Sequence, residues 1–251
     1  MSREIRILPD AAAIAGAAAE EYVSAAREAV QATGRFAVAL SGGSTPRVLY
    51  SLLAAEGALR AAIPWDKTYF FFGDERHVPP DSPESNFRMA NETLLSRVPL
   101  RKEQVSRVRG EMPDAAEAAV DYEKTLRGFF GISDAELPRF DLILLGMGPD
   151  GHTASLFPGT AALHVKNRLV VSNWIQKLNT ERITLTAPVL NNAARILFMV
   201  LGEDKAAALG AVLGGSSDPE KFPAQLIQPK SGKVLWLVDK TAARLLSKAA
   251  T

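Results

Sequence analysis

The sequence predicts an α/β protein with a three-layer, Rossmann-like architecture, in which helices cover both faces of a mostly parallel sheet. Two observations predict this class. Short apolar runs recur along the chain, and each ends at a glycine or a polar turn, which is typical of strands buried on both faces of a sheet. Segments with helical spacing separate these runs, and such alternation indicates parallel strands joined by right-handed crossovers.

The first predicted helix covers residues 11–33, an alanine-rich segment that is stopped near Gly34. The apolar runs place strands at residues 35–40, 68–73, 140–146, 195–202 and 233–239. Further helices are expected at residues 46–55, 86–96, 114–129, 203–213 and 239–249. No clean linker and no repeat interrupts this order, so we expect residues 1–251 to form a single α/β domain.

Charge and composition exclude several classes of function. The chain has 29 Lys and Arg against 28 Asp and Glu, a net charge of +1, so we expect no nucleic-acid and no membrane partner. It has no cysteine, which excludes disulfides, thiolate catalysis and cysteine-ligated metals and fits a cytoplasmic location. Pro9 and Asp10 interrupt the N-terminal segment too early for a signal peptide, and no stretch approaches the roughly 18 apolar residues that cross a bilayer.

Ligands of such sheets bind beyond the carboxyl ends of the strands, and three loops there carry more polar chemistry than a turn requires. The first loop reads SGGSTP, residues 41–46. Gly42 and Gly43 let the backbone bend, Thr45 is a candidate N-cap, and the proline that follows suits the first helical position. The free amides of the helix start, with the hydroxyls of Ser44 and Thr45, indicate an anion site suited to phosphate. An ordinary capped turn is an equal alternative on this segment alone.

The second loop, residues 73–80, places Asp74, Glu75, Arg76 and His77 directly after an apolar strand. Four ionisable side chains would be costly to bury alone, so we expect them either paired around a ligand or solvated. His77 is expected to brace the loop through a hydrogen bond. No second histidine or carboxylate cluster completes a familiar ligand set, so no metal is expected.

The third loop, residues 146–158, surrounds Asp150 and His152 with three glycines, which indicates a close approach to the backbone. His152 opens a segment with helical tendency. A histidine at a helix start feels the positive end of the dipole, which favours the neutral imidazole that a general base requires. A histidine that only caps the helix is the alternative.

The motifs LSGGSTPRxLY, GDERHVPxDxxxSNxxM and LGMGPDGHTASLFPG occur in this order along the chain. Together they resemble the 6-phosphogluconolactonase family, the hydrolases of the oxidative pentose phosphate pathway, and the resemblance covers nearly the whole chain. It implies the fold that this family shares with glucosamine-6-phosphate deaminases. A deaminase or isomerase is the first alternative function, although its pattern has an acidic residue where this chain has Phe157. A non-catalytic sugar-phosphate-binding protein is the second.

The resemblance implies that the chain hydrolyses 6-phospho-D-glucono-1,5-lactone, a small sugar phosphate, without a cofactor or a metal. We expect a monomer or a weak dimer. The substrate phosphate would bind residues 42–45, and Arg182 and Lys205 would supply positive charge.

The resemblance also implies roles at the reacting carbonyl. His152 would be the general base that draws a proton from water, and either Asp150 or Asp74 would orient its ring. Arg76 would lie near the ester oxygens and stabilise the oxyanion of the tetrahedral intermediate.

Overall fold

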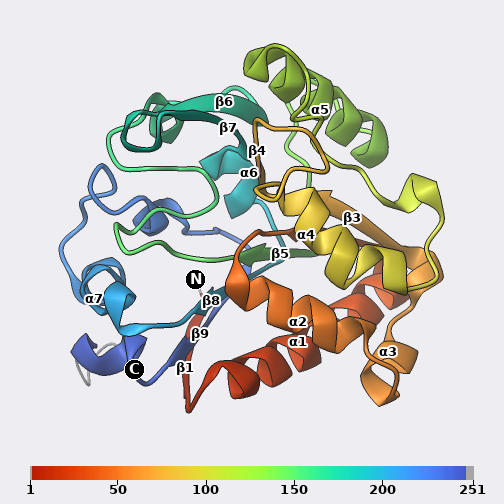
Figure 1. The fold of residues 1–251 in the computed structure, drawn as a ribbon, viewed down its shortest axis with the longest axis horizontal. Helices are drawn as coiled ribbons and strands as arrows, with labels where there is room; N and C mark the ends of the chain where they lie inside the picture. Colours follow the sequence, from red (N-terminus) through yellow and green to blue (C-terminus); the bar gives the residue numbers. More distant parts are fainter. Residues whose placement is uncertain (1, 247–251) are drawn as a thin grey trace.

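The computed structural model describes residues 2–246 of the chain (Figure 1). Six parallel strands form the main sheet in the order β1-β9-β8-β5-β2-β3. Their bounds are Ser2–Leu8 for β1, Phe36–Leu40 for β2, Thr68–Phe72 for β3, Leu142–Leu145 for β5, Arg195–Val200 for β8 and Lys233–Asp239 for β9. All five predicted strands are therefore confirmed, within a few residues at each end.

Seven α-helices lie within the described residues. They are α1 Ala11–Thr33, α2 Ser44–Ala54, α3 Ala58–Ala62, α4 Asn86–Thr93, α5 Ala115–Phe130, α6 Ala187–Asn191 and α7 Ala206–Gly214. Helix α1 is capped by the side chain of Asp10 and ends at Gly34, which takes the left-handed conformation at φ 77°. None of these helices is long and apolar enough to cross a membrane.

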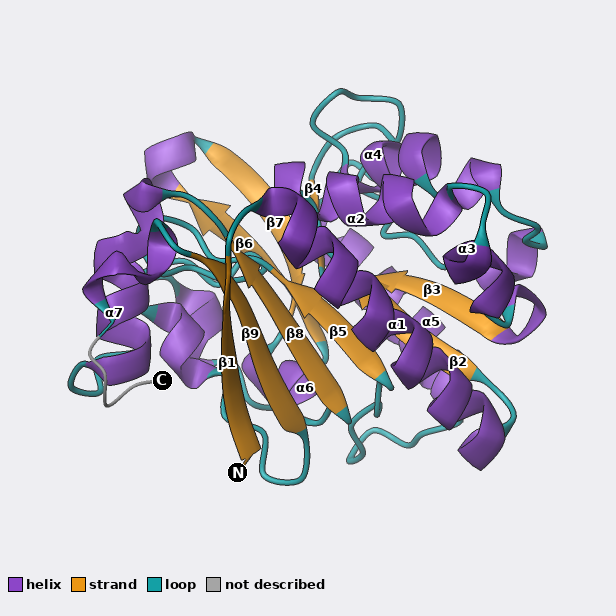
Figure 2. Cartoon of the chain, turned by 90° about the horizontal axis from the view of Figure 1, so that it is seen from below, coloured by secondary structure: helices purple, strands orange, loops and turns teal. Residues whose placement is uncertain are grey.

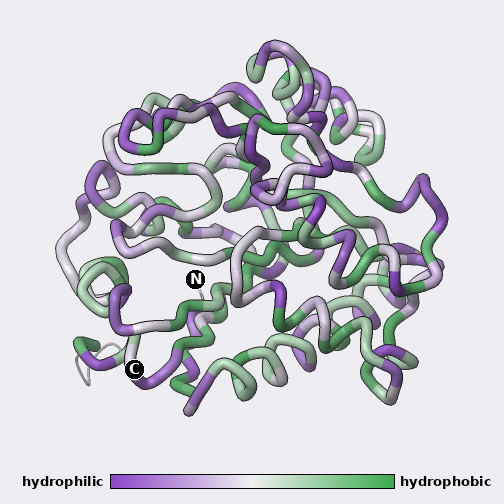
Figure 3. Tube along the Cα trace, in the orientation of Figure 1, coloured by the Kyte–Doolittle hydropathy of each residue, from purple (hydrophilic) through white to green (hydrophobic). Residues whose placement is uncertain are grey.

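Two helices cover one face of the parallel sheet. Figure 2 shows α1 crossing this face with α2 beside it. On the opposite side lie α5 and a second, smaller sheet, so the three predicted layers are present (Figure 1). Figure 3 shows the hydrophobic residues following the central strands, and β2 and β5 are buried along their whole length. Burial on both faces explains why these strands read as continuous apolar runs.

Three parts of the fold differ from the prediction. Strand β1 extends the sheet by pairing with β9, although the N-terminal segment shows no continuous apolar run. The small antiparallel sheet, in the order β4-β7-β6, was not expected; its strands are Asp74–Arg76, Thr180–Leu185 and Val170–Ile175. The last predicted helix is wrong as far as residue 246, where only a 3₁₀ turn, Ala242–Leu245, forms; residues 247–249 lie outside the described chain.

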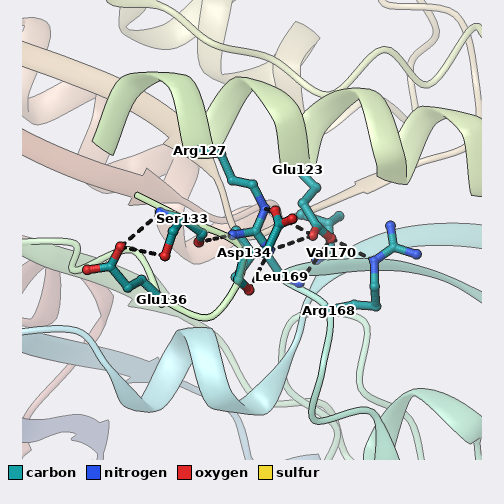
Figure 4. Close-up of polar contacts among 8 residues, drawn as sticks. All are labelled: Glu123, Arg127, Ser133, Asp134, Glu136, Arg168, Leu169 and Val170. Carbon is teal, nitrogen blue, oxygen red and sulfur yellow. Dashed lines mark hydrogen bonds and ion pairs between the residues drawn. The ribbon is translucent and has the colours of Figure 1, made fainter. Parts of the chain in front are cut away.

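The buried carboxylate of Glu123 joins α5 to the small sheet (Figure 4). One of its oxygens accepts hydrogen bonds from Arg127 on the same helix. The other accepts from Arg168 and from the backbone amides of Leu169 and Val170, where β6 begins. Because both oxygens are occupied by donors, the burial of this charge is compensated. The contact fixes the small sheet beside the parallel one.

The hydrophobic core is one continuous cluster that includes strands of both sheets. Ile183 and Leu185 of β7 belong to the same cluster as Val38 of β2 and Leu144 of β5. This continuity holds the small sheet at the carboxyl ends of the parallel strands, and the single domain stays a prediction.

Candidate active site

The three polar loops meet in one cavity at the carboxyl ends of the parallel strands. Its volume is about 230 Å³. The lining residues of interest are Gly42, Gly43, Ser44 and Thr45 from the first loop, Asp74 and Arg76 from the second, Gly148 and His152 from the third, and Asn86 and Lys205. Eight of the ten candidate residues named from the sequence therefore line this cavity. A ninth, Asp150, lies beside it in contact with His152, and the tenth is Arg182.

The first loop begins its helix earlier than the sequence suggested. Helix α2 starts at Ser44, and its N-cap is Gly43, which makes no side-chain cap and has φ 108°. Thr45 is therefore not the N-cap, and Pro46 occupies the third helical position rather than the first. A helix start at Ser44 favours anion binding, because the amides of Ser44 and Thr45 have no acceptor within the helix and no cap side chain covers them.

Gly42 makes room for a buried asparagine that the sequence analysis did not single out. A Cβ at Gly42 would lie 1.8 Å from Oδ1 of Asn86. The amide of Asn86 donates to the backbone oxygen of Asp74 at 3.0 Å and lies 3.4 Å from its carboxylate. Asn86 thus connects the first loop to the second, and α2 and α4 lie side by side (Figure 1). Its place in the SNxxM motif was the signal that could have identified it.

Two residues of the second loop serve the structure of the loop. Glu75 is 2% exposed, and its carboxylate accepts hydrogen bonds from the amides of Arg76, Asn86 and Phe87 and from the Ser85 hydroxyl, at the start of α4. Burial raises the pKa of Glu75, although these hydrogen bonds act to lower it. His77 contacts the carbonyl of Met112 at 2.6 Å, so the predicted bracing hydrogen bond is confirmed.

Asp150 is the carboxylate that orients the imidazole. Its Oδ1 lies 2.5 Å from Nδ1 of His152 and accepts the His152 backbone amide at 3.2 Å. Asp74 is instead held by Ser155, whose hydroxyl donates to Oδ2 at 2.7 Å. With Nδ1 bound to a carboxylate, Nε2 is the nitrogen left to accept a proton.

The imidazole of His152 is packed closely against a glycine and an aromatic ring. A Cβ at Gly148 would lie 2.1 Å from Cε1 of His152, so this position requires glycine. Phe157 stacks on the imidazole, with 3.9 Å between ring centroids and 17° between planes. These neighbours leave the ring little freedom to rotate.

The imidazole of His152 is neutral near pH 7, as expected, but the expected reason is wrong. Residues 152–157 form a turn, closed by a bridge between Thr153 and Leu156, so no helix dipole acts there. Burial is the main cause that lowers the pKa of His152 to about 4. Asp74 opposes this shift, while the positive charges of Arg182, Arg76 and Lys205 add to it.

Two arginines lie side by side on neighbouring strands and lack acceptors for part of their guanidinium groups. Arg76 of β4 is in register with Arg182 of β7. Arg76 donates through Nη1 to the backbone oxygen of Glu84 at 2.5 Å, but among residues 2–246 its buried Nε has no partner, nor have Nε and Nη1 of Arg182. Buried N–H groups without acceptors are costly, so they suit an anionic group of a ligand.

The two remaining cations expected at the phosphate lie at different places. Lys205 lines the cavity with the first loop, and its ammonium pairs with Asp204 at 2.8 Å. Arg182 lines a neighbouring recess of about 240 Å³, together with Arg76 and His152. The structure therefore brings Arg182 to the imidazole rather than to the glycine turn.

Lys177 is a further residue that the sequence analysis missed. It lines the same recess as Arg182 and forms an ion pair with Asp150. No motif marks it, because it lies in a polar turn between two strands that were not predicted. Within residues 2–246 no group of three or more His, Asp or Glu side chains could hold a metal ion.

Comparison with known proteins gives consistent matches along the chain. Residues 9–236 match the family described as glucosamine-6-phosphate isomerases/6-phosphogluconolactonase. A 6-phosphogluconolactonase of Nostoc sp. is 41% identical, over 98% of this chain and 100% of that protein. The human 6-phosphogluconolactonase is 42% identical, over 86% of this chain and 83% of that protein.

Solved structures agree with the fold. The 6-phosphogluconolactonase from Trypanosoma brucei superposes with a TM-score of 0.86 at 28% identity, over 98% of this chain and 99% of that chain. A monomeric glucosamine-6-phosphate deaminase superposes with a TM-score of 0.78 at 20% identity, over 96% of this chain and 99% of that chain. The second likeness concerns the fold alone, so the chemistry of the site has to separate the two activities.

Proposed function

This chain belongs to the glucosamine-6-phosphate isomerase/6-phosphogluconolactonase family, and from that premise we propose that it hydrolyses 6-phospho-D-glucono-1,5-lactone to 6-phospho-D-gluconate. This is the lactonase step of the oxidative pentose phosphate pathway. One observation carries the proposal beyond the family: the neutral imidazole of His152 lines the same cavity as Arg76 and the first residues of α2, Ser44 and Thr45.

His152 is the general base of the proposed reaction. Its Nε2 takes a proton from a water molecule while the water oxygen attacks C1 of the lactone, and Asp150 stabilises the imidazolium that forms. The tetrahedral intermediate carries its negative charge on the former carbonyl oxygen. Breaking the bond between C1 and the ring oxygen then returns the proton from imidazolium to that leaving oxygen, so His152 ends neutral.

The charges at the carbonyl are supplied by the paired arginines. Arg76 lines the cavity, and its unpartnered Nε is available to the oxyanion and then to the carboxylate of the product. Arg182 lies beside it, and we assign it to the same end of the substrate instead of the phosphate end expected from the sequence. A preorganised donor at such a site contributes about 10²- to 10³-fold in rate.

The phosphate of the substrate binds at the first loop, residues 42–45. The amides and hydroxyls of Ser44 and Thr45 provide donors, and Lys205, which lines the same cavity, provides charge. A test compares Lys205→Met with Arg182→Met. The Lys205 variant should lose the preference for 6-phosphogluconate over gluconate, whereas the Arg182 variant should lose kcat with that preference retained. The reverse pattern would return Arg182 to the phosphate.

Deamination is less well supported by the site. The deaminase pattern has an acidic residue at the position of Phe157, and here that ring is stacked on the base. A phenyl ring cannot carry a proton between the substrate atoms, as ring opening and isomerisation require.

The deciding experiment follows acid release from freshly prepared 6-phosphogluconolactone near neutral pH, with the spontaneous hydrolysis subtracted. We expect fast, enzyme-dependent acid release and no ammonia from glucosamine 6-phosphate. His152→Ala should lower kcat by about 10²- to 10⁴-fold. Ammonia release without lactonase activity would overturn the proposed function in favour of the deaminase.

A further inference from the structure

The turn between β6 and β7 lies against the loop that carries the proposed base. Gln176–Leu178 form one 3₁₀ turn that ends at Asn179, which has φ 48°. Lys177 from this turn donates to Oδ2 of Asp150, while Oδ1 of the same carboxylate contacts Nδ1 of His152. Each oxygen of Asp150 therefore has its own partner, and the carboxylate bridges an ammonium and an imidazole.

Lys177 also contacts the second group that holds the imidazole. Its ammonium nitrogen lies 5.0 Å from the centroid of Phe157, within the range of a cation–π interaction, and that ring stacks on His152. One side chain thus touches both the carboxylate at Nδ1 and the aromatic ring on the imidazole face. A carboxylate bound at both oxygens has less freedom to rotate than one bound at a single oxygen.

We propose that Lys177 is a positioning residue, which orients Asp150 and thereby sets the tautomer and the proton affinity of His152. The inference rests on the proposed function only in that His152 is taken as the base. Lys177 itself does not reach the reacting atoms; it acts through Asp150 and Phe157.

The direction of the effect follows from the charges around the imidazole. The charged groups that act on His152 are Asp150 from its own loop, Asp74 and Arg76 of β4, Arg182 of β7 and Lys205 before α7, and Lys177 is paired with Asp150. Removing the Lys177 ammonium leaves the negative charge of Asp150 less compensated, so imidazolium becomes easier to form. Lys177 is 54% exposed and its charge is screened, so we expect its removal to raise the pKa of His152 by only about half a unit.

The test replaces the ammonium in two ways. Lys177→Met keeps most of the aliphatic chain and removes the charge, and Lys177→Arg retains a donor for Asp150. Lys124→Met, at an exposed position on α5, is the control for loss of a surface lysine. Thermal unfolding of each variant checks that the fold is retained, which we expect because the Lys177 side chain is half exposed.

The first readout needs no activity. The ¹⁵N shifts of the His152 ring in the ligand-free protein report the tautomer and the titration midpoint, and the chain has only 3 histidines to assign. In Lys177→Met the less compensated carboxylate of Asp150 should keep the ring proton on Nδ1 in a larger fraction of molecules, and the midpoint should rise by about 0.5 pH unit. Lys177→Arg should restore both values, and Lys124→Met should match the parent protein.

The second readout is the pH profile of the lactonase reaction. Lys177→Met should move the acid limb of kcat upward by the same amount and lower the plateau by about 3- to 10-fold, with KM within about 2-fold. An unchanged ring tautomer and midpoint in Lys177→Met, with a folded protein, would overturn the inference even when the lactonase is active. If the parent protein lacked lactonase activity, the proposed function would fail, and the ring shifts would still decide the role of Lys177.

Discussion

Replacing Gly148 by alanine tests the placement of the base without changing any polar group. The new Cβ would lie 2.1 Å from Cε1 and 2.2 Å from Nδ1 of His152, and 2.9 Å from Oδ1 of Asp150. Contacts this short cannot persist, and Phe157 is stacked on the same ring, so the imidazole has to shift. Because 26% of the His152 side chain is exposed, the imidazole has room to move, by about 1 Å or more.

A displacement of about 1 Å at a reacting group costs on the order of 10²-fold in rate, and loss of the base costs about 10²- to 10⁴-fold. We therefore expect Gly148→Ala to lower kcat about 100-fold. Binding of 6-phosphogluconate, measured by calorimetry, should weaken much less, because the proposed phosphate site is formed by another loop, residues 42–45. Gly128→Ala is the matched control, since its Cβ in α5 meets nothing within 4 Å. Near-normal kcat in Gly148→Ala would refute the assignment of His152.

Three further predictions concern binding and stability. Gly43→Val forces a β-branched residue to φ 108° and should weaken binding of 6-phosphogluconate more than that of gluconate in calorimetry; equal losses would indicate a folding defect. Tyr22→Phe removes a buried hydroxyl that has no partner within residues 2–246, so urea unfolding should show a gain of about 1 kcal/mol, and a loss would reveal a missed hydrogen bond. Burial alone would raise the pKa of Glu123, but hydrogen bonds from Arg127, Arg168 and the Leu169 amide hold this pKa below 4.5. The ionised carboxylate therefore contributes fully to the free energy of unfolding above that pH, and the contribution is lost as the pH falls through the lowered pKa. Glu123→Gln should thus be about 1–3 kcal/mol less stable at pH 7, with the difference shrinking below pH 4; a constant difference would contradict the ionic contribution.

The inner strands of the parallel sheet could be predicted because a strand buried on two faces is apolar at successive positions, which a short stretch of sequence shows. The runs at 35–40 and 140–146 are apolar at successive positions, and no other element explains short runs of that kind. The same reasoning missed β1, because an edge strand alternates with polar residues and its pairing with β9 joins the two ends of the chain. It also missed β6, whose apolar run is interrupted by the polar residues Ser172 and Asn173.

The candidate site, too, could be predicted from the sequence only in part. The residue types at the carboxyl ends of the strands, Gly43, Arg76 and His152 among them, were evident from the motifs and from the rule that places ligands at that edge. Their partners were not. The choice of Asp150 over Asp74 depends on where the third loop turns back, and the pairing of Arg182 with Arg76 depends on an antiparallel register that no local pattern encodes.

The sequence by itself determined the fold class, the three loops and the chemistry that they carry, because backbone preference and burial act over a few neighbouring residues. Only the tertiary structure decided why the imidazole is neutral and which groups hold it. Burial against Phe157 and the fields of Arg182, Arg76 and Lys205 lower its pKa, and no helix contributes. Such effects depend on distances between side chains from separate elements, and these distances exist only once the chain has folded.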